Sequence, residues 1–80
     1  MPKREYTKSE IIGTLTARMN WYKKSIHIKQ GTIPYENNFD FPTGDIEGWT
    51  GAYIELKNTI SMLNYGYDAS GLNNNYRSEL

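Results

Sequence analysis

The sequence lacks cysteine altogether and has a single histidine, His27. Without cysteine the chain can form neither a disulfide framework nor a thiolate metal site, and it has no cysteine nucleophile for covalent catalysis. It also contains no run of about 20 apolar residues, the length that a membrane-spanning helix needs. Its first residues have no apolar run of the kind found in a signal peptide. We therefore expect a soluble, cytoplasmic protein with no membrane partner.

The net charge is zero, but the charged residues are unevenly distributed. Residues 1–30 hold seven of the nine basic side chains and two of the nine acidic ones, and residues 31–80 hold the reverse. Opposite potentials attract each other within one molecule or between two copies of it. The uneven distribution therefore indicates that the two halves of the chain meet, in one subunit or across two.

Size and composition limit how well the chain can fold alone. A chain of 80 residues with 38% apolar side chains buries a smaller fraction of its surface than a domain of ordinary size. Two Trp, seven Tyr and two Phe supply large side chains, and Tyr and Trp tolerate a wet interface because each keeps a polar group. We expect one small helical domain over residues 1–72, completed by homo-oligomerisation.

A first helix is predicted from about residue 8 to residue 30. Thr7 and Glu10 have the spacing of a capping box, in which each side chain satisfies a free backbone amide of the other residue. Gly31 supplies the left-handed residue that commonly ends a helix. Between them the apolar residues recur three and four apart and form one stripe, which consists of Ile11, Leu15, Met19, Tyr22 and Ile26.

A second helix is predicted after Pro42, with Thr43 or Asp45 as its N-cap and Gly66 at its end. Its apolar positions are again three and four apart: Trp49, Ala52, Tyr53, Leu56, Ile60 and Leu63. Residues 31–44 between the helices contain two Pro and two Gly and form a loop rich in aromatic residues. The polar residues 73–80 are expected to lack order. The predicted fold is all-α, a two-helix hairpin whose aromatic loop packs across it.

Residue patterns typical of an enzyme are missing. His27 lies near the end of the first predicted helix, where a cap or surface role is favoured by the negative helix end. The segment from Gly48 to Gly51 lacks the lysine of a phosphate-binding loop. Asp40, Asp45 and Glu47 lack the regular alternation of a calcium loop. We expect a non-enzymatic binding protein without catalytic residues, metal or cofactor.

The first functional hypothesis is stoichiometric binding to a host protein, with a defence component as one candidate, whose action the chain inhibits. Aromatic side chains often dominate the energy of protein interfaces. The candidate contact residues are therefore the aromatic ones that lie in the loop and on the two helices: Trp21, Tyr35, Phe39, Phe41, Trp49 and Tyr53. Two roles stay open for the loop of residues 31–44, which covers either the core or a site.

The second hypothesis is sequestration of a nucleotide by an oligomer. Aromatic rings stack on bases and lysine or arginine meets phosphate, and this combination is offered by Tyr6, Arg18, Trp21, Tyr22, Lys23 and Lys24. Tyr6, the run from Ser9 to Ile11, and Lys23 or Lys24 resemble elements of the anti-CBASS family of phage proteins, short helical oligomers that sequester cyclic nucleotides. The segment from Leu56 to Leu63 is similar to the last helix of that family. The resemblance implies a nucleotide second messenger as ligand.

A third hypothesis is nucleic-acid binding, because Arg18, Lys23, Lys24 and Lys29 surround Trp21 on the first predicted helix. The neutral total charge argues against it, because such modules normally carry net positive charge. In composition the chain is similar to early accessory proteins of bacterial viruses, since it is small, free of cysteine and rich in Asn and Tyr. That similarity predicts a phage or mobile-element protein acting in the host cytoplasm.

Overall fold

The protein is described here from a computed structural model that covers residues 5–66, 73–78 and 80. Within these residues it contains three helices and no strand: α1 (Lys8–Gln30), α2 (Ile46–Tyr65) and α3 (Asn73–Ser78). The predicted all-α fold, with two long helices packed against each other, is confirmed. Its completion by homo-oligomerisation stays a prediction. None of the described helices is both long enough and apolar enough to cross a membrane.

Both ends of α1 form as the sequence predicts. The Thr7 hydroxyl oxygen accepts a hydrogen bond of 3.1 Å from the backbone N–H of Glu10, which satisfies one of the free amides of the first turn. Gly31 adopts a left-handed conformation with φ of 80° and ends the helix. The backbone N–H of Thr32 then donates to the carbonyl oxygen of His27 at 3.0 Å, which turns the chain into the loop.

The structure decides between the two N-caps predicted for α2. Asp45 is the cap, and its carboxylate accepts a hydrogen bond of 2.9 Å from the backbone N–H of Gly48. Thr43 instead contributes its carbonyl oxygen to the indole of Trp49. Gly66 ends the helix with φ of 75°, as predicted.

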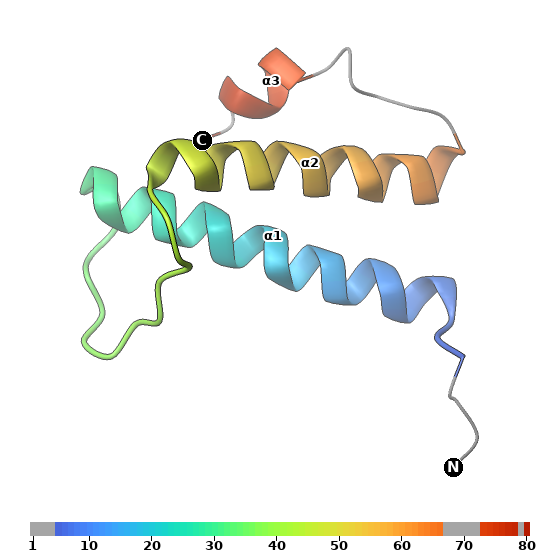
Figure 1. The fold of residues 1–80 in the computed structure, drawn as a ribbon, viewed down its shortest axis with the longest axis horizontal. Coiled ribbons are helices and arrows are strands. Elements are labelled where there is room, and N and C mark those ends of the chain that lie inside the picture. Colours follow the sequence, from blue (N-terminus) through green and yellow to red (C-terminus); the bar gives the residue numbers. More distant parts are fainter. Residues whose placement is uncertain (1–4, 67–72, 79) are drawn as a thin grey trace.

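The helices form a single layer. α1 and α2 lie side by side and run in opposite directions, and residues 31–45 join them at one end (Figure 1). From top to bottom of this view, the order across the molecule is α3, α2, α1 and the loop (Figure 1). The extents are 41 × 37 × 18 Å, so the layer is thin along the viewing direction. We call the end that carries the loop the closed end, and the opposite end, where α1 begins and α2 stops, the open end.

The core lies at the closed end. The buried side chains of α1 lie close to its C-terminus, and those of α2 lie in its N-terminal half; they are Ser25, Ile26, Ile28, Trp49, Tyr53 and Ile54. Ser25 and Ile28 were not in the predicted stripe. They are buried because they share the helix face of Trp21 and Lys24, which contacts the loop.

The open-end half of the predicted stripes is not buried. Ile11 is exposed, and Leu15, Met19, Leu56, Ile60 and Leu63 are only partly buried. A helix in a single layer is covered by other helices only at its sides, so its remaining faces stay open to solvent. The sequence pattern identified the apolar residues correctly, but it did not show that one chain leaves half of them uncovered.

The C-terminal segment contributes a short third helix that the sequence pattern did not predict. Residues 73–78 form α3, and the ring of Tyr76 is buried against Tyr53 and Ile54 of α2. The Tyr76 hydroxyl also lies 3.2 Å from the hydroxyl of Ser61. An aromatic side chain that packs on the core and satisfies its polar group compensates for the ordering of a polar segment. The predicted end of the domain at residue 72 falls outside the described residues.

Candidate functional site

Two tryptophan side chains fix the loop to the helices. The indole N–H of Trp21, in the middle of α1, donates a hydrogen bond of 2.6 Å to the carbonyl oxygen of Asp40. The indole N–H of Trp49, in the first turn of α2, donates one of 3.1 Å to the carbonyl oxygen of Thr43. Both bonds satisfy backbone carbonyls that no helix or sheet pairs. The second half of the loop is therefore held at two points.

A continuous stack of rings connects the loop to the core. The Phe41 ring lies nearly parallel to the buried Trp49 indole, with centroids 5.8 Å apart. Tyr35 stacks on Phe41 at 6.1 Å, and Phe39 meets Phe41 edge to face at 4.8 Å. These distances lie within the range in which aromatic pairs attract each other. Tyr35 is thus fixed in position, because Phe41, on which it stacks, itself stacks on the buried Trp49.

Two lysines of α1 cover this cluster. The Lys29 ammonium lies 4.7 Å from the centroid of Phe41, and the Lys24 ammonium lies 5.4 Å from that of Phe39. Each such contact contributes about 0.5–1 kcal/mol at an exposed site. Lys24 also forms a 2.8 Å ion pair with Glu36. That pair is largely exposed, so its own contribution is below about 1 kcal/mol.

A tight turn places the two partners of Lys24. The backbone N–H of Phe39 donates a hydrogen bond of 3.1 Å to the carbonyl oxygen of Glu36. Asn38 within this turn has φ of 69°, a left-handed conformation that asparagine tolerates better than most residues. The turn brings the carboxylate of Glu36 and the ring of Phe39 to the same ammonium group. Lys24 therefore fixes the first half of the loop, in the same way that the indoles of Trp21 and Trp49 fix its second half.

The predicted protein-binding residues fall into three groups. The loop surface, which we define as Trp21, Tyr35, Phe39 and Phe41, is partly open to solvent, with Tyr35 63% and Trp21 38% exposed. Trp49 supports this surface from beneath and is buried. Tyr53 lies in the core with Ile54 and Tyr76 and takes no part in the loop surface.

The predicted nucleotide-binding residues are not gathered in one place. Tyr6 lies at the start of α1, beside a hollow of about 240 Å³ that Ile11, Thr14 and Leu15 also line. Tyr22 packs against the core cluster, although its ring is 5.4 Å from that of Trp21. Arg18 is exposed on α1. A single subunit therefore does not combine Tyr6 with the lysines.

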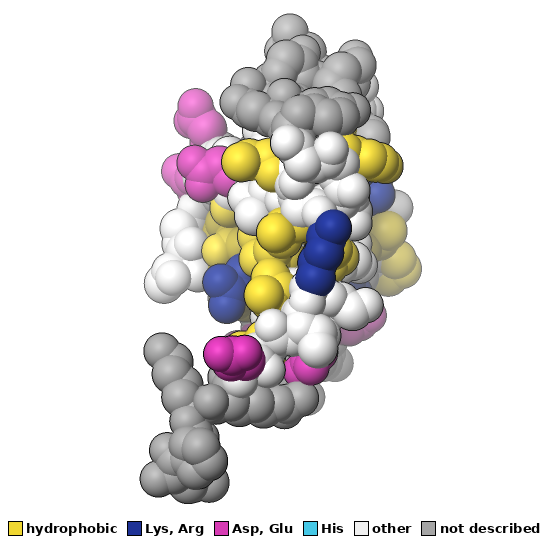
Figure 2. Space-filling model, turned by 90° about the vertical axis from the view of Figure 1, so that its right-hand side faces the viewer, with side chains coloured by type: hydrophobic (Ala, Val, Ile, Leu, Met, Phe, Trp, Pro, Cys, Tyr) yellow, Lys and Arg dark blue, Asp and Glu magenta, His cyan; other side chains and the backbone are white. Residues whose placement is uncertain are grey.

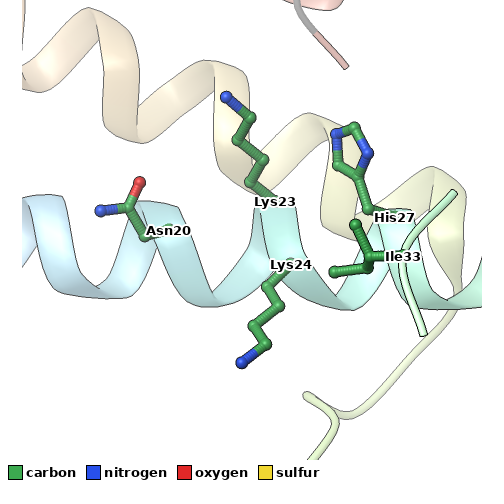
Figure 3. A pocket seen from close by; sticks show the side chains of 5 residues that line it. All are labelled: Asn20, Lys23, Lys24, His27 and Ile33. Atoms are coloured by element: carbon green, nitrogen blue, oxygen red, sulfur yellow. The ribbon is translucent and has the colours of Figure 1, made fainter. Parts of the chain in front are cut away.

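The lysines do line a groove of their own. It is an open hollow of about 390 Å³ along α1, bounded by Asn20, Lys23, Lys24, His27 and Ile33 (Figure 3). Lys23 and His27 point to the same side of the helix, whereas Lys24 points to the other (Figure 3). The imidazole Nδ1 of His27 lies 2.8 Å from the hydroxyl of Thr32. Its Nε2 is buried and has no hydrogen-bond partner among the residues that the structure describes.

The sequence did not show which charged residues border the loop surface. Lys29 covers Phe41, and Glu36 pairs with Lys24. The signal available in the sequence was the proximity of an acidic residue to aromatic ones in the loop, opposite a basic helix.

In the described residues, no three acidic or histidine side chains lie close enough together to hold a metal ion.

Comparison with known protein families, with curated protein sequences and with solved structures found no match. The resemblance to the anti-CBASS family stays a prediction.

Proposed function

We propose that this chain acts by stoichiometric binding of another protein, without catalysing a reaction, and that the loop surface is the contact site. The observation that carries the proposal is the ring of Tyr35, which is largely exposed and yet stacked through Phe41 on the buried Trp49. An exposed aromatic side chain that is already fixed loses little conformational freedom on binding. Tyrosine and tryptophan are also the residues that most often carry interface energy.

The composition of the loop surface supports the same function. Protein interfaces combine an aromatic centre with a polar rim. Here Tyr35, Phe39 and Phe41 form the centre, and the ion pair of Lys24 with Glu36 lies beside them. We further propose that the bound protein is a host component and that the chain, encoded by a phage or mobile element, inhibits it in the cytoplasm.

The test is capture of a partner from bacterial lysate by the immobilised chain, quantified by mass spectrometry. We expect one protein in a ratio near one to one with the chain. Tyr35→Ala should reduce its capture at least tenfold, because the ring contributes directly to the contact. Tyr65→Ala is the matched control, since Tyr65 is 66% exposed but lies at the open end. Equal loss in both variants, or no stoichiometric protein, would refute the proposal.

A second candidate function is supported by the groove along α1. The ammonium group of Lys23, which lines this groove, is a donor that suits a phosphate group. The corresponding ligand is a nucleotide, as in the hypothesis that the chain sequesters a nucleotide. Thermal unfolding with cyclic nucleotides, linear nucleotides and an oligonucleotide should then show a rise of several degrees for one class, and Lys23→Gln should abolish it. A flat panel would eliminate this candidate.

A further inference from the structure

The short helix α3 binds to the side of α2 that faces away from α1 (Figure 1). Its Tyr76 side chain is buried against Tyr53 and Ile54, and Leu80 packs against the same cluster. The backbone N–H of Leu80 donates a hydrogen bond of 3.2 Å to the carbonyl oxygen of Arg77. Residues four apart lie on the same side of a helix, so one face of this segment contacts α2.

The site that holds α3 offers specific partners to a tyrosine. The ammonium group of Lys57 lies 5.3 Å from the centroid of the Tyr76 ring and 5.9 Å from that of Tyr53. The hydroxyl of Tyr76 lies 3.2 Å from that of Ser61. A cation over the ring favours an aromatic side chain, and the second hydroxyl favours tyrosine over phenylalanine, which cannot form this bond. We define the α3-binding site as Tyr53, Ile54, Lys57 and Ser61.

Exposed apolar surface alone does not explain where α3 binds. At the open end, hydrophobic side chains gather in the middle of the face (Figure 2), and Met62 and Tyr65 of α2 are 50% and 66% exposed. α3 lies instead over Tyr53 and Ile54, in the half of α2 nearer the closed end (Figure 1). The specific contacts of Tyr76 account for this position better than apolar surface does.

The helical form of α3 depends on this site. α3 has six residues, and isolated helices shorter than about 12 residues are marginal in water. Three of the six are asparagine, a weak helix former. Arg77 and Ser78 are exposed, so the apolar contacts described for this segment come from Tyr76 and Leu80. A segment held by two apolar side chains can leave by local unfolding while α1 and α2 stay packed.

Departure of α3 uncovers a surface that another chain can occupy. Tyr53 and Ile54 are only 1% and 6% exposed, because α3 covers them on one side and Met19 and Tyr22 of α1 pack against the same cluster. Without α3, one side of both residues is open. α3 itself shows which ligand fits there, namely a short helix with a tyrosine and a leucine four residues later. Helices commonly bind grooves of other proteins through anchors at such spacings.

We propose that the α3-binding site is a second protein-binding site of this chain. Its ligand is a helical segment of another protein that carries tyrosine and leucine four residues apart. α3 occupies the site and blocks it until such a segment displaces α3. The site is separate from the loop surface, because α3 and the loop lie on opposite sides of the two long helices (Figure 1).

The test adds a synthetic peptide of residues 73–80 to the full chain that carries Tyr76→Ala, in which α3 has lost its anchor. We expect the peptide to shift the nuclear magnetic resonance signals of residues 53–61. It should bind this variant about tenfold more tightly than the unmodified chain, where α3 leaves only a fraction of the sites free. No binding to the variant, or equal affinity for both chains, would overturn the proposal.

Two further measurements test the chemistry of the site. A peptide with Tyr76→Phe should bind the variant about fivefold more weakly, because the bond to Ser61 is lost. A peptide with Tyr76→Ala should not bind. Equal binding of all three peptides would overturn the specificity for tyrosine. Tyr35→Ala, introduced into the variant chain, is the control at the loop surface and should leave peptide affinity unchanged.

Circular dichroism of the Tyr76→Ala chain checks that α1 and α2 persist. The chain with Tyr76→Phe keeps the buried ring and loses only the hydroxyl, so it provides the same test if Tyr76→Ala unfolds. The peptide of residues 73–80 should bind this chain about fivefold more tightly than the unmodified chain, because its own α3 competes less well. Equal affinity for these two chains would show that α3 does not compete through Tyr76, and would overturn the proposal.

Discussion

The indole N–H of Trp21 donates a hydrogen bond of 2.6 Å to the carbonyl oxygen of Asp40, and this bond joins the middle of α1 to the returning half of the loop. It explains why a 15-residue connection rich in Gly, Pro and Asn has a defined course. The loop is fixed by side chains of both helices, and its aromatic residues are presented to solvent in one arrangement. Our account of function depends on that fixation.

Removing the indole N–H should loosen the loop without unfolding the hairpin. Trp21→Phe leaves the Asp40 carbonyl oxygen without this donor, and we expect a loss of about 1 kcal/mol in the free energy of unfolding. Amide hydrogen exchange of residues 39–41 should accelerate more than that of α2. Tyr35→Phe is the control, since it keeps the ring and removes only a hydroxyl. Unchanged exchange in the loop of Trp21→Phe would contradict the fixation by Trp21.

The ring of Phe41 should be the most important side chain of the loop for stability. It contacts Tyr35, Phe39, Trp49 and the ammonium of Lys29. Because it is partly buried, Phe41→Ala should cost about 2 kcal/mol, below the range for a fully buried ring. Phe41→Leu keeps the apolar bulk but loses the stacking and cation–π contacts, and should cost about 1 kcal/mol. Urea unfolding of both variants measures the difference; a Phe41→Leu variant as stable as the unmodified chain would show that ring stacking adds nothing.

The helix termini were the most predictable part of the fold. Thr7 with Glu10, and the glycines at 31 and 66, give local signals that depend on a few neighbouring residues. The loop surface was predictable only as a set of residue types. Which rings would stack, and which lysine would cover them, depends on the relative position of α1, α2 and the loop, and periodicity does not specify it.

The residues named for nucleotide binding show how a helix separates neighbours in the sequence. Trp21 and Tyr22 are adjacent in the chain and their rings are close, but they belong to different faces of α1. Trp21 hydrogen-bonds to the loop, whereas Tyr22 packs against the core. Tyr6 lies at the other end of the helix. A helix separates neighbouring residues by about 100° around its axis, so a cluster in the sequence need not be a cluster in space.

Two glycine substitutions should have opposite effects on stability. Gly51 is an exposed residue inside α2, and a Cβ there would meet no atom within 4 Å. Gly51→Ala should therefore raise the free energy of unfolding by about 1 kcal/mol. Gly31 has φ of 80°, so Gly31→Ala should lower that free energy by about 1 kcal/mol although space is available. Thermal unfolding of both variants decides the matter; a stabilising Gly31→Ala would contradict the left-handed cap.

The most direct test of the central claim, that the loop surface binds another protein, is site-specific photocrosslinking in bacterial cells. A photoreactive phenylalanine analogue replaces Tyr35 in one sample and Tyr65 in another. At position 35 we predict one adduct with a different protein, in amounts comparable to the chain. At position 65, at the opposite end of the helices, that adduct should be absent. A crosslink at position 35 to no protein, or only to a second copy of the chain, would contradict the account.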